Sequence, residues 1–118
     1  MKEREIKVSG VENKRNPQLR VEVADSFFRR FLGLMGRKSI EDGRGVLIVP
    51  CNSIHMCFMR FSIDAVYIDK KYRVIKVVRN LRPWWGVSWC PEAWAVIEMN
   101  AGEAAHYGIE KNMVLNVL

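Results

Sequence analysis

The fold is decided by residues 61–78, which read FSIDAVYIDKKYRVIKVV. Two apolar runs, at residues 61–68 and 72–78, lie on either side of the polar triplet Asp69–Lys71. A short polar triplet between two such runs is typical of a hairpin loop. The sequence therefore predicts an antiparallel hairpin with a loop of three or four residues.

Further strands are predicted on both sides of this hairpin. The segments that indicate them are short and are either apolar throughout or alternate polar with apolar residues. They are residues 2–9, 19–23, 45–50, 94–99 and 113–118. Residues 102–107 predict a single helical turn that ends near Gly108.

One main amphipathic helix is predicted at roughly residues 25–35. Apolar side chains recur there at spacings of three and four, Asp25 and Ser26 offer an N-cap, and Gly36 is placed to end the helix. With about seven strands and this helix, residues 1–118 are expected to form one α+β domain. Its sheet is expected to be mainly antiparallel and curved or barrel-like.

The composition indicates a small, folded and basic protein. The chain has 118 residues, 49% of them hydrophobic, which suits one core and is too short for two. Its net charge is +6, and 18 of its 19 Lys and Arg residues precede residue 91. Such a basic surface favours encounters with polyanions, so a nucleic-acid-associated protein is one hypothesis.

The cellular location is predicted from what the sequence lacks. No apolar run is long enough to span a bilayer, and no apolar core of a secretory signal follows the charged residues 1–6. Cys51, Cys57 and Cys90 cannot all pair within one chain, and their spacing matches no common zinc motif. We therefore expect a cytoplasmic protein with free thiols and no membrane span.

Two blocks of the sequence resemble the DUF192 family, a group of small prokaryotic domains without an assigned function. RFLGLMGR at residues 30–37 is similar to the family's R-x-x-G-L-M-x-R block, and IHMCFMRFSID at residues 54–64 is similar to its block ending in Ile-x-Asp. Supporting matches follow at LRPW (81–84) and AVIE (95–98). The resemblance covers roughly residues 19–118.

The chain also departs from many DUF192 proteins. It has Ser62 where they have a proline, and it lacks the export signal that many of them carry. The resemblance implies the fold and transfers no catalytic residue, because the family has no agreed chemistry.

Potential metal ligands are densest between residues 51 and 59. Four of them would share one face of a single extended strand: Cys51, His55, Cys57 and Met59. A Cys/His/Met set would suit Cu(I), but these residue types also fill hydrophobic cores, and Pro50 is expected to interrupt the strand. We therefore predict no metal site and no cofactor.

Asp64 and Glu98 each interrupt an otherwise apolar strand. A buried carboxylate needs a cation or hydrogen-bond donors, and Arg37 or Arg60 is the expected partner of Asp64. This structural role is favoured over that of a general base in a cleft. The spacing leaves open whether Asp64 and Glu98 face one cavity as a paired-carboxylate site.

Residues 79–89, RNLRPWWGVSW, combine arginines with three tryptophans in a predicted loop. Indole rings are costly to leave in water, so they either cover an open end of the sheet or form a binding surface, and a lid can do both. Together with the polar groups of residues 55–64, this loop is the predicted site. The candidate ligand-binding residues are His55, Met59, Arg60, Asp64, Arg82, Trp84 and Trp85.

These residues favour a binding module over an enzyme. Arg82 would hold an anionic group, Asp64 would orient a donor, and the indoles would offer flat apolar area to a small molecule or a peptide. A small enzyme that uses Asp64 and His55, or a nucleic-acid-associated protein, remains as an alternative. A nucleophilic Cys57 with His55 or His106 as its base is disfavoured, because no third residue orients either histidine. The ligand and the oligomeric state stay open.

Overall fold

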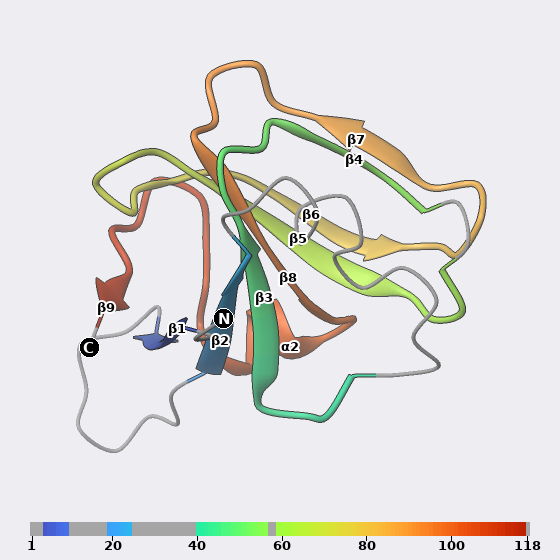
Figure 1. Ribbon diagram of the computed structural model, residues 1–118, viewed down its shortest axis with the longest axis horizontal. Coiled ribbons are helices and arrows are strands. Elements are labelled where there is room, and N and C mark those ends of the chain that lie inside the picture. Colours follow the sequence, from blue (N-terminus) through green and yellow to red (C-terminus); the bar gives the residue numbers. More distant parts are fainter. Residues whose placement is uncertain (1–3, 10–18, 25–39, 57–58, 118) are drawn as a thin grey trace.

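The computed structural model describes residues 4–9, 19–24, 40–56 and 59–117. Within these ranges the chain forms a seven-stranded sheet, a separate two-stranded ribbon and a short helix (Figure 1). The strands are β1 (Arg4–Ser9), β2 (Leu19–Ala24), β3 (Arg44–Ile48), β4 (Ser53–His55), β5 (Ile63–Ile68), β6 (Val74–Leu81), β7 (Val87–Trp89), β8 (Ala95–Asn100) and β9 (Asn116–Val117), and the helix is α2 (Glu103–His106).

The predicted hairpin is confirmed as β5 and β6. The Asp69 N–H donates to the Arg73 carbonyl at 3.0 Å, which leaves Lys70, Lys71 and Tyr72 as a three-residue loop. Asp69 Oδ1 accepts the backbone N–H groups of Lys71 at 2.8 Å and Arg73 at 3.0 Å. An aspartate that binds its own turn in this way is a local signal, and for that reason the hairpin could be predicted from the sequence.

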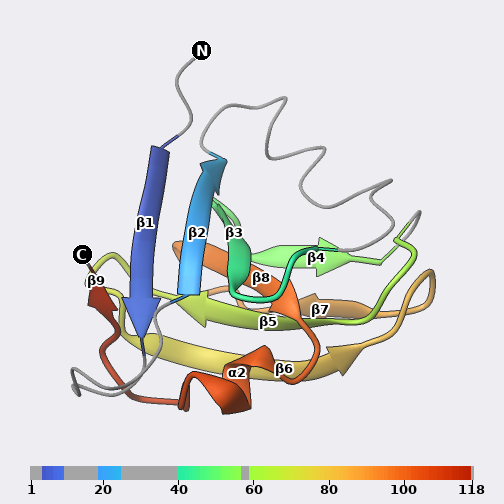
Figure 2. The same ribbon diagram turned by 90° about the horizontal axis from the view of Figure 1, so that it is seen from below.

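The large sheet has the strand order β6-β5-β8-β3-β2-β1-β9. Its pairs are antiparallel except β2 with β3, which run parallel, so the mainly antiparallel character is confirmed. β1 and β2 run across the direction of β5 and β6 (Figure 2). The sheet is nevertheless open, because the outer strands β6 and β9 lie at opposite edges and do not pair with each other. The sequence predicted a curved or barrel-like sheet, and the barrel is therefore wrong: the sheet does not close, although an isolated bridge between Arg73 and Val114 links the β5–β6 hairpin to the segment before β9.

The helical content differs from the prediction. The main amphipathic helix expected at residues 25–35 lies outside the described residues. The helical turn expected at residues 102–107 is present as α2, four residues long and preceded by Gly102 with φ of 94°. The described residues thus show a strand-dominated fold with a short helix and do not support a domain built around one main helix. Among them, no helix is long and apolar enough to cross a membrane.

Separate hydrophobic clusters line the two faces of the sheet. On one face, here the α2 face, Ala104 and Leu115 from the C-terminal region pack with sheet residues such as Val66. On the opposite face, here the ribbon face, Met56, which directly follows β4, packs with sheet residues such as Tyr67. Figure 1 shows β4 and β7 above the sheet and α2 below it. Because side chains alternate along a strand, neighbouring residues of β5 and β8 belong to different faces.

Candidate functional site

The segment rich in arginine and tryptophan contains a strand where a loop was predicted. β7 pairs antiparallel with β4, and the register places Trp89 opposite Ser53 and Val87 opposite His55. The prediction of a loop at residues 79–89 is therefore wrong at β7, and it is also wrong at residues 79–81, which belong to β6. Prolines and tryptophans obscured the strand, because its partner lies some 30 residues earlier and only tertiary pairing identifies it.

The turn before β7 is held against the chain that follows β4. The Met56 N–H donates to the Gly86 carbonyl at 2.8 Å, and the Met56 carbonyl accepts the Trp84 N–H at 2.7 Å. A Cβ atom at Gly86 would lie 2.8 Å from both the Arg82 carbonyl oxygen and Met56 Cγ, so this approach requires glycine. These contacts bring Trp84 and Arg82 next to the segment that carries His55.

The ribbon made of β4 and β7 has a buried inner side. There the Ser88 and Tyr67 hydroxyls form a hydrogen bond of 2.6 Å, which joins β7 to β5. Burial raises the pKa of Tyr67 to about 12, although the hydrogen bond with Ser88 acts in the opposite direction. The inner side therefore anchors the ribbon to the sheet.

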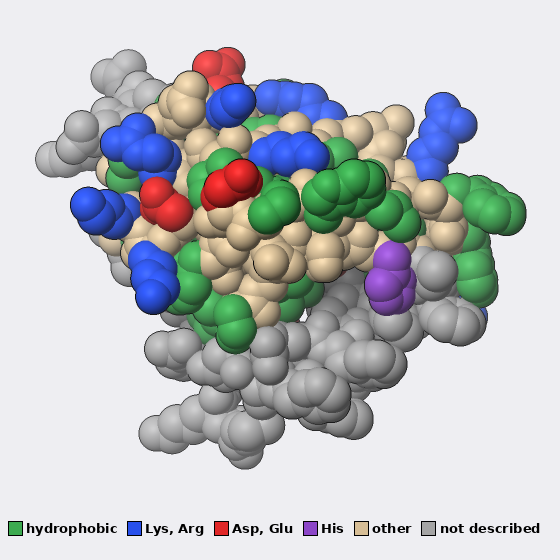
Figure 3. Space-filling model, turned by 90° about the horizontal axis from the view of Figure 1, so that it is seen from above, with side chains coloured by type: hydrophobic (Ala, Val, Ile, Leu, Met, Phe, Trp, Pro, Cys, Tyr) green, Lys and Arg blue, Asp and Glu red, His purple; other side chains and the backbone are tan. Residues whose placement is uncertain are grey.

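The outer side of the ribbon and its turn is exposed and aromatic. The exposed fractions are 52% for Trp84, 90% for Trp85, 58% for Val87 and 61% for Trp89, and His55 is exposed as well. We call these five residues the tryptophan surface. Figure 3 shows hydrophobic and basic side chains, and fewer acidic ones, on the side of the molecule that carries β4 and β7. The interpretation of the indoles as buried cover for an open sheet end is thus wrong.

The other predicted site residues are placed differently. Arg60 and Arg82 are exposed, whereas Met59 is buried among the apolar side chains of the ribbon face. Asp64 is only 1% exposed and lies on the α2 face. The structure thus brings His55 together with the turn that holds Arg82 and the two tryptophans, but it leaves Met59 and Asp64 out of that surface.

Backbone amides surround the Asp64 carboxylate. Its two oxygens accept three N–H groups, from Asn80 at 3.0 Å, Gly102 at 2.9 Å and Ala104 at 3.1 Å. Arg37 or Arg60 was the predicted partner of this carboxylate, but these backbone N–H groups bind it. Arg60 is exposed, and Arg37 lies outside the described residues. Asp64 therefore ties the end of β6 and the start of α2 to β5, which is a structural role.

A paired-carboxylate site is excluded by the register between β5 and β8. Asp64 lies opposite Met99, and Ala65 lies opposite Glu98, so the two carboxylates project from opposite faces of the sheet. His55 lies on the β4–β7 ribbon, whereas Asp64 lies on the α2 face of the sheet. The two side chains therefore do not meet. The geometry gives no support to an enzyme that uses Asp64 and His55 as a pair.

The cysteine-rich segment does not present one shared face. His55 is exposed while Met59 is buried, and Cys51 Sγ donates to the Ser53 carbonyl at 3.1 Å. Burial raises the pKa of the Cys90 thiol, and Cys57 lies outside the described residues. Within the ranges that the structure covers, no three His, Cys, Asp or Glu side chains come together as potential metal ligands.

A cleft of about 790 Å³ opens beyond the far end of the ribbon. Three segments line it: residues 50–52 before β4, the β5–β6 loop with Arg73, and residues 92–94 before β8. We call it the basic cleft because its loop wall carries Lys70 and Lys71. The sequence alone did not indicate this cleft, since Lys70 and Lys71 fitted an ordinary hairpin loop and the other walls lie about 20 residues away in either direction along the chain.

Comparison with known proteins finds uncharacterised relatives. The sequence model of the DUF192 family, described as "Uncharacterized ACR", matches residues 9–117. UPF0127 proteins from Thermococcus sibiricus and Pyrococcus horikoshii are 41% and 42% identical over 70 and 69 residues. These matches cover 55% and 54% of this chain but 44% and 57% of the relatives. The chain thus spans about half the length of the curated relatives it matches.

Two solved structures have a similar fold. A protein of unknown function from Novosphingobium aromaticivorans DSM 12444 gives a TM-score of 0.81 at 23% identity, over 97% of this chain and 84% of that chain. A protein from Sinorhizobium meliloti 1021, named as a proposed transcription regulator, gives 0.84 at 20% identity, over 98% of this chain and 94% of that chain. At these identities the likeness shows the fold alone.

Proposed function

Because this chain belongs to the DUF192 family, whose description leaves it uncharacterised, we propose a function from the chain's own side chains: it binds an acidic peptide segment of a partner protein on the tryptophan surface. The observation that carries the proposal is the exposure of three indoles on one turn and one strand, at Trp84, Trp85 and Trp89.

Indole rings on a fixed scaffold suit protein recognition. Each Trp side chain offers roughly 150–250 Å² of contact area, and Trp and Arg are enriched among the residues that dominate binding energy. The ribbon is held in place by the Tyr67–Ser88 hydrogen bond and by the backbone bonds of Met56. A partner would therefore meet a preformed surface and would lose little free energy to ordering it.

The charges beside the indoles favour an acidic partner. Neither residues 53–56 nor residues 82–89 contain Asp or Glu. Arg82 is exposed in the turn, and Lys76 Nζ donates to the Trp89 carbonyl at 3.0 Å, which keeps an ammonium group beside β7. Partner carboxylates would find cations here and no acidic residue within these two segments, which favours both specificity and fast association.

Selection of peptides from a phage-displayed library of random 12-residue sequences tests the proposal. We expect enrichment of peptides that combine Asp or Glu with apolar residues. Fluorescence polarisation of a labelled, selected peptide should show that Trp85→Ala weakens binding by about tenfold or more. Val114→Ala, which truncates an exposed apolar residue elsewhere, should leave the affinity unchanged. Equal affinity for Trp85→Ala and the native chain would exclude the tryptophan surface.

The same assay separates nucleic acid from peptide. The net charge of +6 and the exposed indoles would also suit single-stranded nucleic acid, on which indoles stack and cations meet phosphates. A labelled 12-nucleotide oligothymidylate should bind more weakly than the selected peptide. Tighter oligonucleotide binding that falls steeply with salt would replace the peptide by nucleic acid as the partner.

A further inference from the structure

The basic cleft has the size and the fixed walls of a small-molecule site. Its volume of about 790 Å³ falls within the range of roughly 300–1,000 Å³ that is usual for ligand pockets. Backbone hydrogen bonds join its walls: the Cys51 N–H donates to the Trp94 carbonyl and the Trp94 N–H donates to the Ile68 carbonyl, both at 2.9 Å. The cleft is thus built into the end of the sheet and needs no rearrangement to receive a ligand.

One wall of this cleft presents the side chains of Lys70 and Lys71. Asp69 Oδ1 is engaged by two backbone N–H groups of the β5–β6 loop, and this turn projects Lys70 and Lys71 at its tip. Among the described residues, no hydrogen bond or ion pair engages either lysine ammonium group. Arg73, which also lines the cleft, is anchored by a hydrogen bond of 3.0 Å from its Nη1 to the Asn112 carbonyl.

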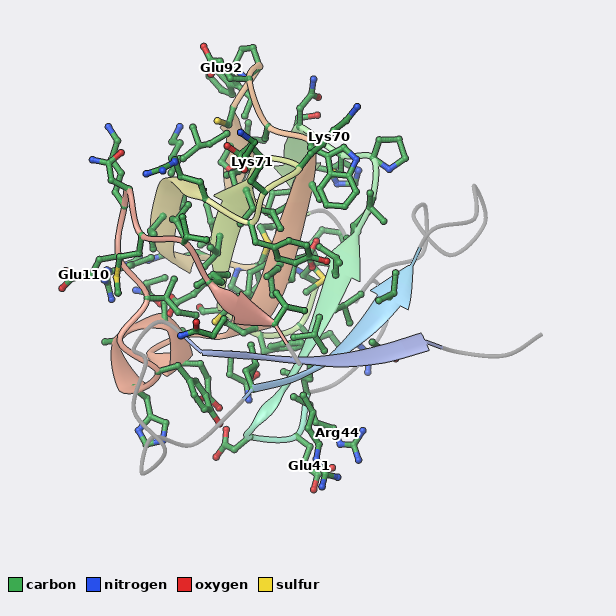
Figure 4. All side chains as sticks on the ribbon, turned by 90° about the vertical axis from the view of Figure 1, so that its left-hand side faces the viewer. Glu41, Arg44, Lys70, Lys71, Glu92 and Glu110 are labelled. Carbon is green, nitrogen blue, oxygen red and sulfur yellow. The ribbon has the colours of Figure 1, made fainter. Side chains whose placement is uncertain are left out.

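The opposite wall is apolar with one acid. Pro50, Ala93 and the half-buried Trp94 give it apolar surface, and the Trp94 ring packs edge-on against Tyr72 with 6.0 Å between centroids. Glu92 supplies a carboxylate, and in Figure 4 it lies at the same end of the molecule as Lys70 and Lys71. A ligand that suits both walls has an acidic group for the lysines and a flat apolar body for the tryptophan side.

We propose that the basic cleft binds a small organic anion, a molecule with a carboxylate or phosphate group on a planar apolar body. The acidic group lies against Lys70 and Lys71, and the planar body lies against Trp94. This site is separate from the tryptophan surface, so either can fail without the other.

Backbone amide chemical shifts of the ¹⁵N-labelled chain test the site with defined probes. Indole-3-acetate supplies a carboxylate and adenosine 5′-monophosphate supplies a phosphate, while indole and adenosine are their uncharged counterparts. We expect at least one anion to shift the amides of residues 69–73 and 92–94 saturably. Its uncharged counterpart should bind about tenfold more weakly. The anion with the larger gain in affinity over its own uncharged counterpart identifies the preferred acidic group. If neither anion gives saturable shifts in these segments, the proposal fails.

Charge variants then distinguish specific binding in the cleft from nonspecific electrostatic attraction to a basic protein. The double variant Lys70→Gln/Lys71→Gln should weaken the affinity for the tighter-binding anion by about tenfold. Glu92→Gln should raise this affinity about twofold, because a repulsive carboxylate is removed. The control is Arg20→Gln/Arg44→Gln, which removes two exposed charges from paired positions of β2 and β3. Figure 4 shows Arg44 at the end of the molecule away from Lys70. Equal weakening by both double variants would overturn the proposal.

Discussion

Asp64 and Trp85 are both conspicuous in the sequence, yet the structure gives them opposite surroundings. Asp64 is a carboxylate that is 1% exposed and accepts three backbone N–H groups. Trp85 is an indole that is 90% exposed at the turn before β7. The charged side chain is inside and the large apolar one is outside, which reverses the usual distribution.

The difference separates residues that hold the fold from residues that are free to bind. A carboxylate that is almost fully buried and accepts three backbone N–H groups is out of reach of a ligand, and removing it leaves backbone donors unpaired. An exposed indole makes few contacts within its own chain, so its loss changes stability little while its surface stays available to a partner. Substitutions at the two regions should therefore affect different measurements.

The largest expected effect on stability comes from Asp64→Asn. An amide can accept only through its oxygen, so its NH₂ group must face at least one of the three N–H donors. We expect the free energy of unfolding to fall by about 2–4 kcal/mol in urea titrations.

The matched control for Asp64→Asn is Asp69→Asn. One oxygen of Asp69 accepts both of its hydrogen bonds, so an asparagine oxygen can replace it, and we expect a loss of about 0.5 kcal/mol. If both variants lost the same free energy, the interpretation of Asp64 as a structural centre would be wrong.

The inner side of the ribbon should show a smaller, coupled effect. Tyr67→Phe and Ser88→Ala each remove one partner of a buried hydrogen bond, at an expected loss of about 1–2 kcal/mol. The double variant should be about 1 kcal/mol more stable than the sum of the two losses predicts, because the second substitution removes a group already left unpaired. Strict additivity in a double-mutant cycle would contradict the anchoring role of this bond.

Alkaline pH should lower the free energy of unfolding through the ionisation of Tyr67. Burial raises the pKa of Tyr67 from 10 to about 12, so between these values the folded chain keeps a proton that the unfolded chain releases. The effect of Tyr67 on stability is absent below pH 10, and it lowers the free energy of unfolding as the pH rises from 10 towards 12. Burial also raises the pKa values of Cys90 and Tyr107, and those contributions persist in Tyr67→Phe. The native chain should therefore lose more stability than Tyr67→Phe, and parallel curves would contradict the assignment.

The smallest expected effect on stability belongs to the tryptophan surface. Trp85→Ala should change the free energy of unfolding by less than about 0.5 kcal/mol, because the ring is almost fully exposed. The same variant should lose peptide binding, so stability and binding separate at this residue. A loss of stability comparable to that of Ser88→Ala would show that the indole packs against its own chain.

The sequence by itself determined the elements whose signals are local. Residues 61–78 form the predicted hairpin because the loop is shaped by Asp69 acting on the backbone of its own turn. The helical turn at α2 was likewise predicted, and so were β2 from alternating polar and apolar residues and β3 and β8 from apolar runs. Neighbours along the chain decide such features, so a single sequence contains them.

Only the tertiary structure decided where the candidate sites lie. The β4–β7 ribbon joins segments about 30 residues apart, and Asp64 accepts N–H groups from residues 16 to 40 positions away. Strand register then set Asp64 and Glu98 on opposite faces, and the meeting of three separate segments formed the basic cleft. The physical reason is that backbone N–H groups and ordinary loop residues occur in every sequence. They acquire a role only when folding brings them together.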